Sequence, residues 1–223
     1  MLRDDEVGLA VTGLSHSFAG KKGSPVFQKL SFTVKKSERL ALLGRNGQGK
    51  STLIRILGGI LDPDEGRVDW SMTSSWPIGF GGGFQGSLSG LDNIRFLARV
   101  YDREYSELRD RVDDFAELGI ALRQPVKHYS SGMRARLAFG LSLAIEFDCY
   151  LIDELVSVGD ARFQAKCNAE LFHTRSNRAF IMASHDMVMV RNLCSRALIV
   201  ENGQAKIFND IDEAIDVYSW LRA

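Results

Sequence analysis

One stretch of this sequence decides its fold: Gly44-Arg45-Asn46-Gly47-Gln48-Gly49-Lys50-Ser51-Thr52. It fits the pattern G-x-x-x-x-G-K-[ST] and lies between a short apolar run at 39–43 and a helix-like run at 52–57. Glycines let the loop curl so that backbone N–H groups point inward, and the helix N-terminus adds partial positive charge. Lys50 is placed to neutralise β- and γ-phosphate oxygens, and the Ser51 hydroxyl is placed to bind Mg²⁺. The stretch therefore predicts a strand, a phosphate-binding loop and a helix.

Composition limits the class of protein. The 223 residues are 45% hydrophobic and 25% charged, which suits one α/β domain with a lobe inserted in it. The 28 basic and 28 acidic side chains balance, so we expect no nucleic-acid partner. We also expect no secretory signal and no membrane span, which needs roughly 20 apolar residues, so a membrane role would require a partner. Cys149, Cys167 and Cys194 are expected to be buried free thiols.

Two kinds of strand are expected. Residues 7–20 alternate loosely and predict an edge strand that ends near Phe18, and residues 26–34 predict a second, antiparallel strand. The later apolar runs are continuous and are separated by helical segments, at 149–152, 179–183 and 197–200. Such runs predict a mostly parallel sheet that is covered on both faces.

Residues 89–146 predict successive helices with no strand between them. Ser89 and Asp92 form a capping box at the start of the first of these helices. We therefore expect a single domain over 1–223, with an α/β core at about 1–85 and 147–223 and a helical subdomain at about 86–146.

Polar residues end two of the expected parallel strands: Asp153-Glu154 and Ser184-His185-Asp186. Ligands of open parallel sheets lie beyond the carboxyl ends of the strands, so these residues should converge with the loop on one γ-phosphate. Asp153 would hold Mg²⁺, Glu154 would orient and partly deprotonate the attacking water, and His185 would donate a hydrogen bond to the γ-phosphate. The alternatives are a solvated acidic turn and a structural histidine.

Three further segments leave their function open. The glycine-rich residues 78–85 form either a slack linker or a hinge that leads to Gln85. Residues 129–133 are either an ordinary helix N-cap or an anion-binding helix N-terminus that completes the site of another copy. Phe18 either stacks on an adenine ring or belongs to the core or an edge.

Taken together, these motifs resemble the ATP-binding cassette of an ABC transporter, over essentially the whole chain. The order matches: phosphate loop, Gln85, a signature at 129–133, Asp153-Glu154, a loop at 157–160, and His185. The resemblance implies ATP and Mg²⁺ as ligands and two ATP molecules sandwiched between two copies of the chain. It also implies that Ser130, Ser131 and Gly132 act on the partner's nucleotide, that Gln85 senses metal and water, and that Asp160 links the two sites.

Departures from the usual L-S-G-G-Q signature point to a subfamily. Ser131 replaces a glycine and Met133 replaces the glutamine. The segments at 129–137 and 79–88 resemble bacterial polysaccharide exporters, especially the ATPase subunit of capsular polysaccharide export. This resemblance implies two copies beneath two permease subunits at the cytoplasmic face of the inner membrane, and, through the permease, periplasmic and outer-membrane export components. The alternatives are an O-antigen or teichoic acid exporter, a soluble ABC ATPase, a small-molecule kinase, and a module that binds ATP without hydrolysing it.

Overall fold

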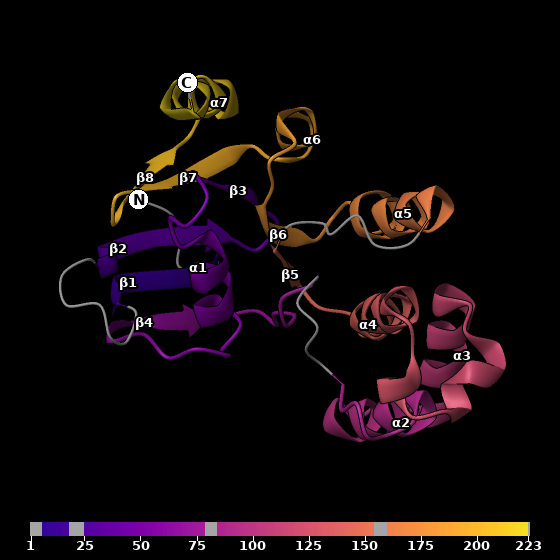
Figure 1. Cartoon of the computed structure of the whole chain (residues 1–223). Coiled ribbons are helices and arrows are strands. Elements are labelled where there is room, and N and C mark those ends of the chain that lie inside the picture. The colour runs from indigo at the N-terminus through magenta and orange to yellow at the C-terminus, as the bar shows by residue number, and fades with distance from the viewer. Residues whose placement is uncertain (1–5, 18–24, 79–83, 154–159, 223) are drawn as a thin grey trace. The chain divides into compact units, whose positions relative to one another are not determined.

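The computed structural model describes residues 6–17, 25–78, 84–153 and 160–222. The chain divides into two compact units, which are described separately (Figure 1). The first comprises residues 1–77, 147–154 and 177–223, and the second comprises 78–146 and 155–176.

The first unit contains two sheets, which confirm the predicted combination of an antiparallel N-terminal part and a mostly parallel core. The antiparallel sheet has the order β2-β1-β4, and the other sheet has the order β5-β6-β3-β7-β8, with only β8 antiparallel to its neighbour. The elements are β1 (Val7–Ser17), β2 (Pro25–Lys35), β3 (Arg39–Leu43), α1 (Lys50–Leu57), β4 (Glu65–Trp70), β5 (Cys149–Asp153), β6 (Ala179–Ala183), α6 (Met187–Leu193), β7 (Arg196–Glu201), β8 (Gln204–Phe208) and α7 (Ile211–Arg222).

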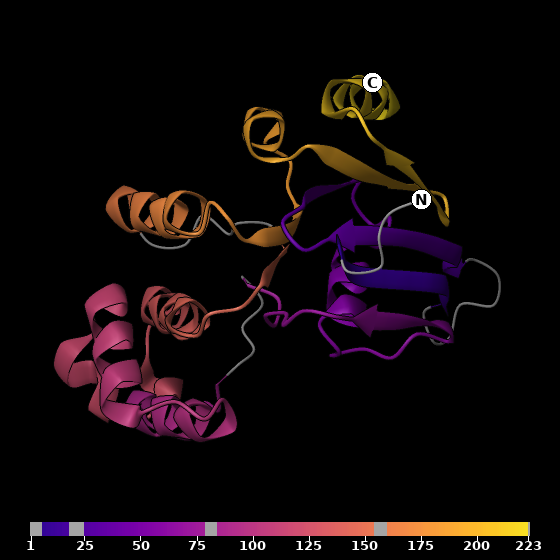
Figure 2. The same cartoon turned by 180° about the vertical axis from the view of Figure 1, so that it is seen from behind.

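Both sheets share one hydrophobic core with α1. Leu53 and Ile54 of α1 are fully buried in the same cluster as Leu9 of β1 and Leu42 of β3. Figures 1 and 2 show α1 beside the three-stranded sheet from opposite sides. Burial of each such side chain stabilises the folded state by roughly 1.5–3 kcal/mol. This packing fixes the start of α1, and so the phosphate loop, against the sheet.

The prediction of an edge strand at the N-terminus is wrong. β1 is the central strand of its sheet, because it pairs with β2 on one side and with β4 on the other. Register shifts interrupt its pairing with β2, including one between Val11 and Leu14. Each shift breaks the strict alternation of a strand, which is why the sequence pattern resembled a weakly specified edge.

The second unit is helical in its described residues. Its elements are α2 (Gly90–Val100), α3 (Tyr105–Ala116), the 3₁₀ turns η2 (Gly119–Arg123) and η3 (Val126–His128), α4 (Ser131–Ala144), α5 (Ala161–Asn168) and the π-helical turn η4 (Ala169–Thr174). The predicted capping box is confirmed, because the Ser89 hydroxyl accepts the Asp92 N–H at 3.1 Å. Gly140 allows α4 to approach α3 closely, since a methyl group there would lie 3.3 Å from Ala116.

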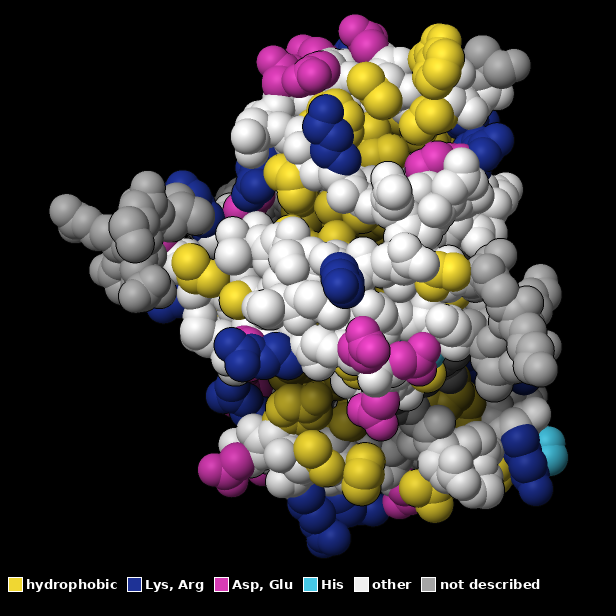
Figure 3. Space-filling view, turned by 90° about the vertical axis from the view of Figure 1, so that its left-hand side faces the viewer, with side chains coloured by type: hydrophobic (Ala, Val, Ile, Leu, Met, Phe, Trp, Pro, Cys, Tyr) yellow, Lys and Arg dark blue, Asp and Glu magenta, His cyan; other side chains and the backbone are white. Residues whose placement is uncertain are grey.

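Helix α7 covers β7 and β8 with one side and faces solvent with the other. Ala214, Ile215 and Tyr218 are buried, whereas Trp220 is 77% exposed. The start of this helix is capped by Asp210, whose carboxylate accepts the Glu213 N–H at 3.1 Å. Figure 3 shows one face of the molecule, and hydrophobic side chains gather at its top, around α7.

All three cysteines are free and buried, as predicted. Burial raises the pKa of each thiol, to about 12 for Cys167 and Cys194. Among the described helices, none combines the length and the apolar character that crossing a membrane requires.

Candidate functional site

A cavity of about 390 Å³ in the first unit unites the loop with two strand ends, as predicted. A volume of this size is typical of a small-molecule site. The cavity is lined by Asn46, Gly47, Gly49, Lys50, Ser51, Thr52, Asp153, Ala183 and His185. Residues that lie more than 130 positions apart in the sequence meet here because β3, β6 and β5 are neighbours and end at the same edge.

The loop from Gly44 to Gly49 has a backbone that requires glycine. Gly44, Gly47 and Gly49 all have positive φ, and a methyl group on Gly49 would also overlap Val26 and Phe27. The Lys50 Nζ donates to the carbonyl oxygens of Gly44 and Arg45 at 2.6 and 3.0 Å. The lysine therefore crosses the loop and concentrates positive charge where the N-terminus of α1 begins.

Two side chains of the loop bind the end of β7 and the turn that follows it. Arg45 forms an ion pair with Glu201, in which its Nε donates at 2.8 Å. The Gln48 side-chain oxygen accepts the Asn202 N–H at 2.7 Å. Sequence reasoning placed Arg45 and Gln48 at the ligand, and the structure adds that both hold the loop in shape.

Ser51 and Asp153 lie side by side in the cavity. The Ser51 hydroxyl donates to the Asp153 carboxylate at 2.9 Å. Ser51 is the second residue of α1, and Asp153 is the last residue of β5. A hydroxyl oxygen and a carboxylate oxygen so close together form part of the all-oxygen set that Mg²⁺ prefers.

His185 follows β6 and is partly buried beside the loop. The next residue, Asp186, caps α6 by accepting the Met189 N–H at 2.9 Å. The His185 Nδ1 lies 2.9 Å from the hydroxyl of Tyr218, in α7. Sequence reasoning identified the histidine but not this tyrosine, whose position in an amphipathic helix resembles that of any core aromatic.

Gln85 belongs to the second unit, where Asn93 holds its backbone. The Gln85 N–H donates to the Asn93 side-chain oxygen at 2.6 Å, and the Asn93 amide returns a bond to the Gln85 carbonyl at 3.1 Å. Asn93 is 2% exposed, so this buried polar side chain is used to fix a loop. Sequence reasoning missed Asn93. An asparagine among the apolar positions of a helix was the available signal.

The signature segment opens α4 in the second unit. Ser130 caps the helix by accepting the Met133 N–H at 3.2 Å, so ordinary N-capping is present. Ser130 and Ser131 are exposed, and little surrounds Gly132, where a methyl group would meet only Ser130 Oγ at 3.9 Å. The start of this helix is therefore accessible as well as capped.

Asp160 caps α5, also in the second unit, by accepting the Phe163 N–H at 2.9 Å. Its carboxylate pairs with Arg136 of α4 at 3.0 Å. The backbone bond from Phe163, and then the charge of Arg136, lower the pKa of Asp160. Its visible role is to join α5 to α4.

Two of the predicted site residues, Phe18 and Glu154, lie outside the described residues, as do residues 157–159. The predictions for Phe18 and Glu154 therefore stay predictions.

Comparison with known proteins identifies the class to which this fold and site belong. The sequence profile described as "ABC transporter" matches residues 27–157, and the chain belongs to this family. The chain is 45% identical to the capsule polysaccharide export ATP-binding protein CtrD of Neisseria meningitidis serogroup B, over 96% of this chain and 99% of the relative. It is 48% identical to the ATP-binding protein BexA of Haemophilus influenzae, over 92% of this chain and 93% of the relative.

A solved structure supports the fold independently. The dimeric, ADP- and Pi-bound structure of the ATP-binding cassette MJ0796 has a TM-score of 0.75 at 16% identity, covering 90% of this chain and 98% of that one. The predicted ABC cassette fold is confirmed.

Proposed function

We propose that this chain is the ATP-binding and ATP-hydrolysing subunit of a bacterial ABC exporter for capsular polysaccharide. The observation that carries the proposal is the 45% identity with CtrD over nearly the full length of both chains. Two copies bind two ATP molecules and drive a separate permease from the cytoplasmic face of the inner membrane. Export components of the periplasm and outer membrane are reached through that permease.

ATP binds in the cavity of the first unit. The N–H groups of the loop and Lys50 hold the phosphates, and Ser51 and Asp153 would hold Mg²⁺ through the two oxygens that lie 2.9 Å apart. When bound, the ion neutralises charge on the phosphate oxygens. Glu154 orients and partly deprotonates the attacking water, and His185 donates a hydrogen bond to the γ-phosphate.

The second copy completes each site. The accessible N-terminus of α4 carries Ser130, Ser131 and Gly132, whose hydroxyl and N–H groups suit an anionic γ-phosphate bound by the partner. The dimeric state of the MJ0796 structure supports this arrangement. Asp160 connects the two sites, and Gln85, with its backbone held by Asn93, contacts metal and water.

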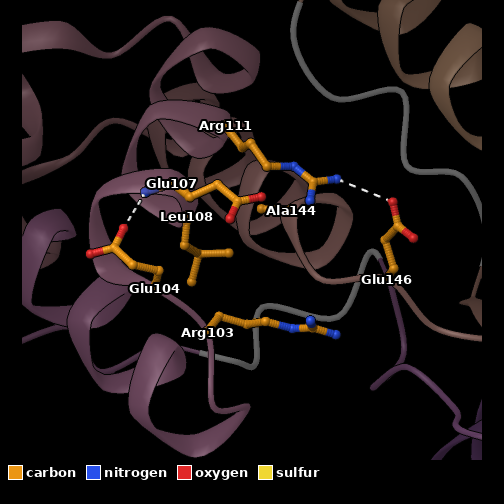
Figure 4. A pocket seen from close by; sticks show the side chains of 7 residues that line it. All are labelled: Arg103, Glu104, Glu107, Leu108, Arg111, Ala144 and Glu146. Atoms are coloured by element: carbon orange, nitrogen blue, oxygen red, sulfur yellow. Dashed lines mark hydrogen bonds and ion pairs between the residues drawn. The ribbon is translucent and has the colours of Figure 1, made fainter.

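The second unit also offers a surface for the permease. A cavity of about 230 Å³ has a floor of Leu108 and Ala144, both nearly buried (Figure 4). Its rim carries charges of both signs, from Arg103, Glu104, Glu107, Arg111 and Glu146. Such a cavity suits a short helix that inserts one apolar side chain between charged neighbours.

Reversing one charge at this rim tests the permease contact. Arg103→Glu should lower the ATP turnover of the complex with the permease roughly fivefold and leave the turnover of the isolated chain unchanged, because an exposed charge pair across a contact is worth up to about 1 kcal/mol. The exposed Arg123 of η2 provides a matched control, since Arg123→Glu makes the same change outside the cavity. Equal effects of both variants would contradict this contact.

The function itself is tested in a strain that lacks the ATP-binding subunit of its capsule exporter. This chain, expressed together with the products of its neighbouring genes, should restore surface polysaccharide and copurify with a permease from detergent-solubilised membranes. Copurification with a permease without restoration of the capsule would place the chain in an exporter of another polymer, such as O-antigen or teichoic acid. Recovery of soluble partners only, with ATPase activity intact, would overturn the export function.

A further inference from the structure

His185 has a partner that comes from the far end of the chain. The Tyr218 hydroxyl lies 2.9 Å from the His185 Nδ1, and Tyr218 is only 1% exposed. Both residues belong to the first unit, where α6 and α7 lie together in both views (Figures 1 and 2). The contact is therefore a partly buried hydrogen bond between α7 and a residue that lines the cavity.

The chemistry of the two groups determines what this bond can do. A neutral imidazole has one nitrogen that donates and one that accepts, and the bond made by one nitrogen decides the state of the other. A phosphate oxygen only accepts, so His185 must present an Nε2–H to it. A tyrosine hydroxyl that donates to Nδ1 leaves the proton on Nε2, which is the tautomer that phosphate recognition requires.

Both partners are held in place by their own elements. Asp186 caps α6 directly after His185, and Asp210 caps α7 before Tyr218. An ion pair at 2.7 Å between Arg191 of α6 and Asp212 of α7 ties the two helices together. Hydrogen-bonding groups that are fixed by packing in this way can orient a neighbouring side chain without losing further conformational entropy.

We propose that Tyr218 is a positioning residue for His185, which it orients and holds as the Nε2–H tautomer by donating its hydroxyl proton to Nδ1. The inference rests on the proposed role of His185 at the γ-phosphate. It makes α7 part of the catalytic apparatus, although Tyr218 itself does not touch the nucleotide.

Nitrogen NMR of the full chain tests the hydrogen bond without any assay of activity. The chain has four histidines, so ¹⁵N-histidine labelling gives few signals, and the signals lost in His185→Ala identify His185. Above the pH at which imidazoles protonate, the wild type should show an unprotonated Nδ1 and a protonated Nε2 for this residue. In Tyr218→Phe the Nδ1 signal should shift. A protonated Nδ1 in the wild type, or an unshifted signal in the variant, would overturn the inference.

Turnover measured on the complex with the permease tests the consequence. Tyr218→Phe should lower kcat about five- to tenfold while the KM for ATP changes less than twofold, because the lost bond orients a group that acts on the γ-phosphate in the transition state. Tyr150→Phe is the matched control: it removes another nearly buried hydroxyl of the first unit, which accepts the Phe147 N–H at 3.3 Å. Its kcat should stay at the wild-type value.

The outcomes separate this inference from the proposed function. An unchanged kcat in Tyr218→Phe, together with a large loss in His185→Ala, would overturn the positioning role alone. The same loss of kcat in Tyr218→Phe and Tyr150→Phe would also overturn it, because a general effect of removing a buried hydroxyl would then explain the result. Full turnover in His185→Ala would overturn the role of the histidine, and the NMR signals would still decide whether Tyr218 sets its tautomer.

Discussion

Replacing Lys50 by alanine is expected to weaken ATP binding roughly 100-fold, because hydrogen bonds to charged groups contribute about 1.5–3 kcal/mol each and the ammonium can reach two phosphate groups. In the structure its Nζ already lies against the Gly44 and Arg45 carbonyls at 2.6 and 3.0 Å. A phosphate that enters the loop therefore meets a positive charge that is in place. No other lysine lines this cavity among the described residues.

The loop itself should survive the Lys50→Ala substitution. Arg45 still pairs with Glu201, and Gln48 still accepts the Asn202 N–H, so the loop stays bound to the end of β7 and to the turn that follows it. Fluorescent-nucleotide titration measures the affinity, and circular dichroism confirms the fold. Lys206→Ala is the control, since it removes an exposed lysine from β8 of the same unit. Normal nucleotide affinity in Lys50→Ala would contradict the assignment of the loop.

The parts of the fold that sequence predicted best are those with a strong local pattern. The continuous apolar runs at 149–152 and 179–183 lie in β5 and β6, because strands buried on both faces carry apolar residues throughout. The strand β8 was not predicted from the sequence. A local signal was available: Asn202-Gly203, both with positive φ, forms the tight hairpin that this dipeptide favours.

The residues of the site also differ in how well the sequence predicted them. The phosphate loop, Asp153 and His185 could be predicted because each lies at the end of a strand, and parallel strands bring their ends to one edge. Asn93 and Tyr218 could not be predicted in this way. Each acts through a bond to a residue in a different segment, and only the packing of α2 or α7 decides that such a bond forms.

Glutamine in place of Glu154 is expected to lower ATP turnover about 100-fold or more, which is the usual contribution of a general base. The position follows Asp153, which ends β5 beside Ser51 and the loop. Glutamine keeps the volume and the hydrogen-bonding reach of glutamate but cannot accept a proton from water. Single-turnover ATP hydrolysis measures the loss, and Glu65→Gln, an exposed glutamate at the start of β4, serves as the control.

Binding and hydrolysis should respond in opposite directions to Glu154→Gln. A carboxylate beside a γ-phosphate repels it, so removing that charge should leave ATP affinity equal or higher and should hold two chains together around unhydrolysed ATP. Size-exclusion chromatography with ATP should then show a dimer that the wild type forms only briefly. Asp153→Asn should behave differently, because weaker metal binding lowers ATP affinity as well as turnover. If both variants lost affinity equally, Glu154 would be a ligand of the metal rather than the base, since only a base can be removed from the site without loosening its substrate.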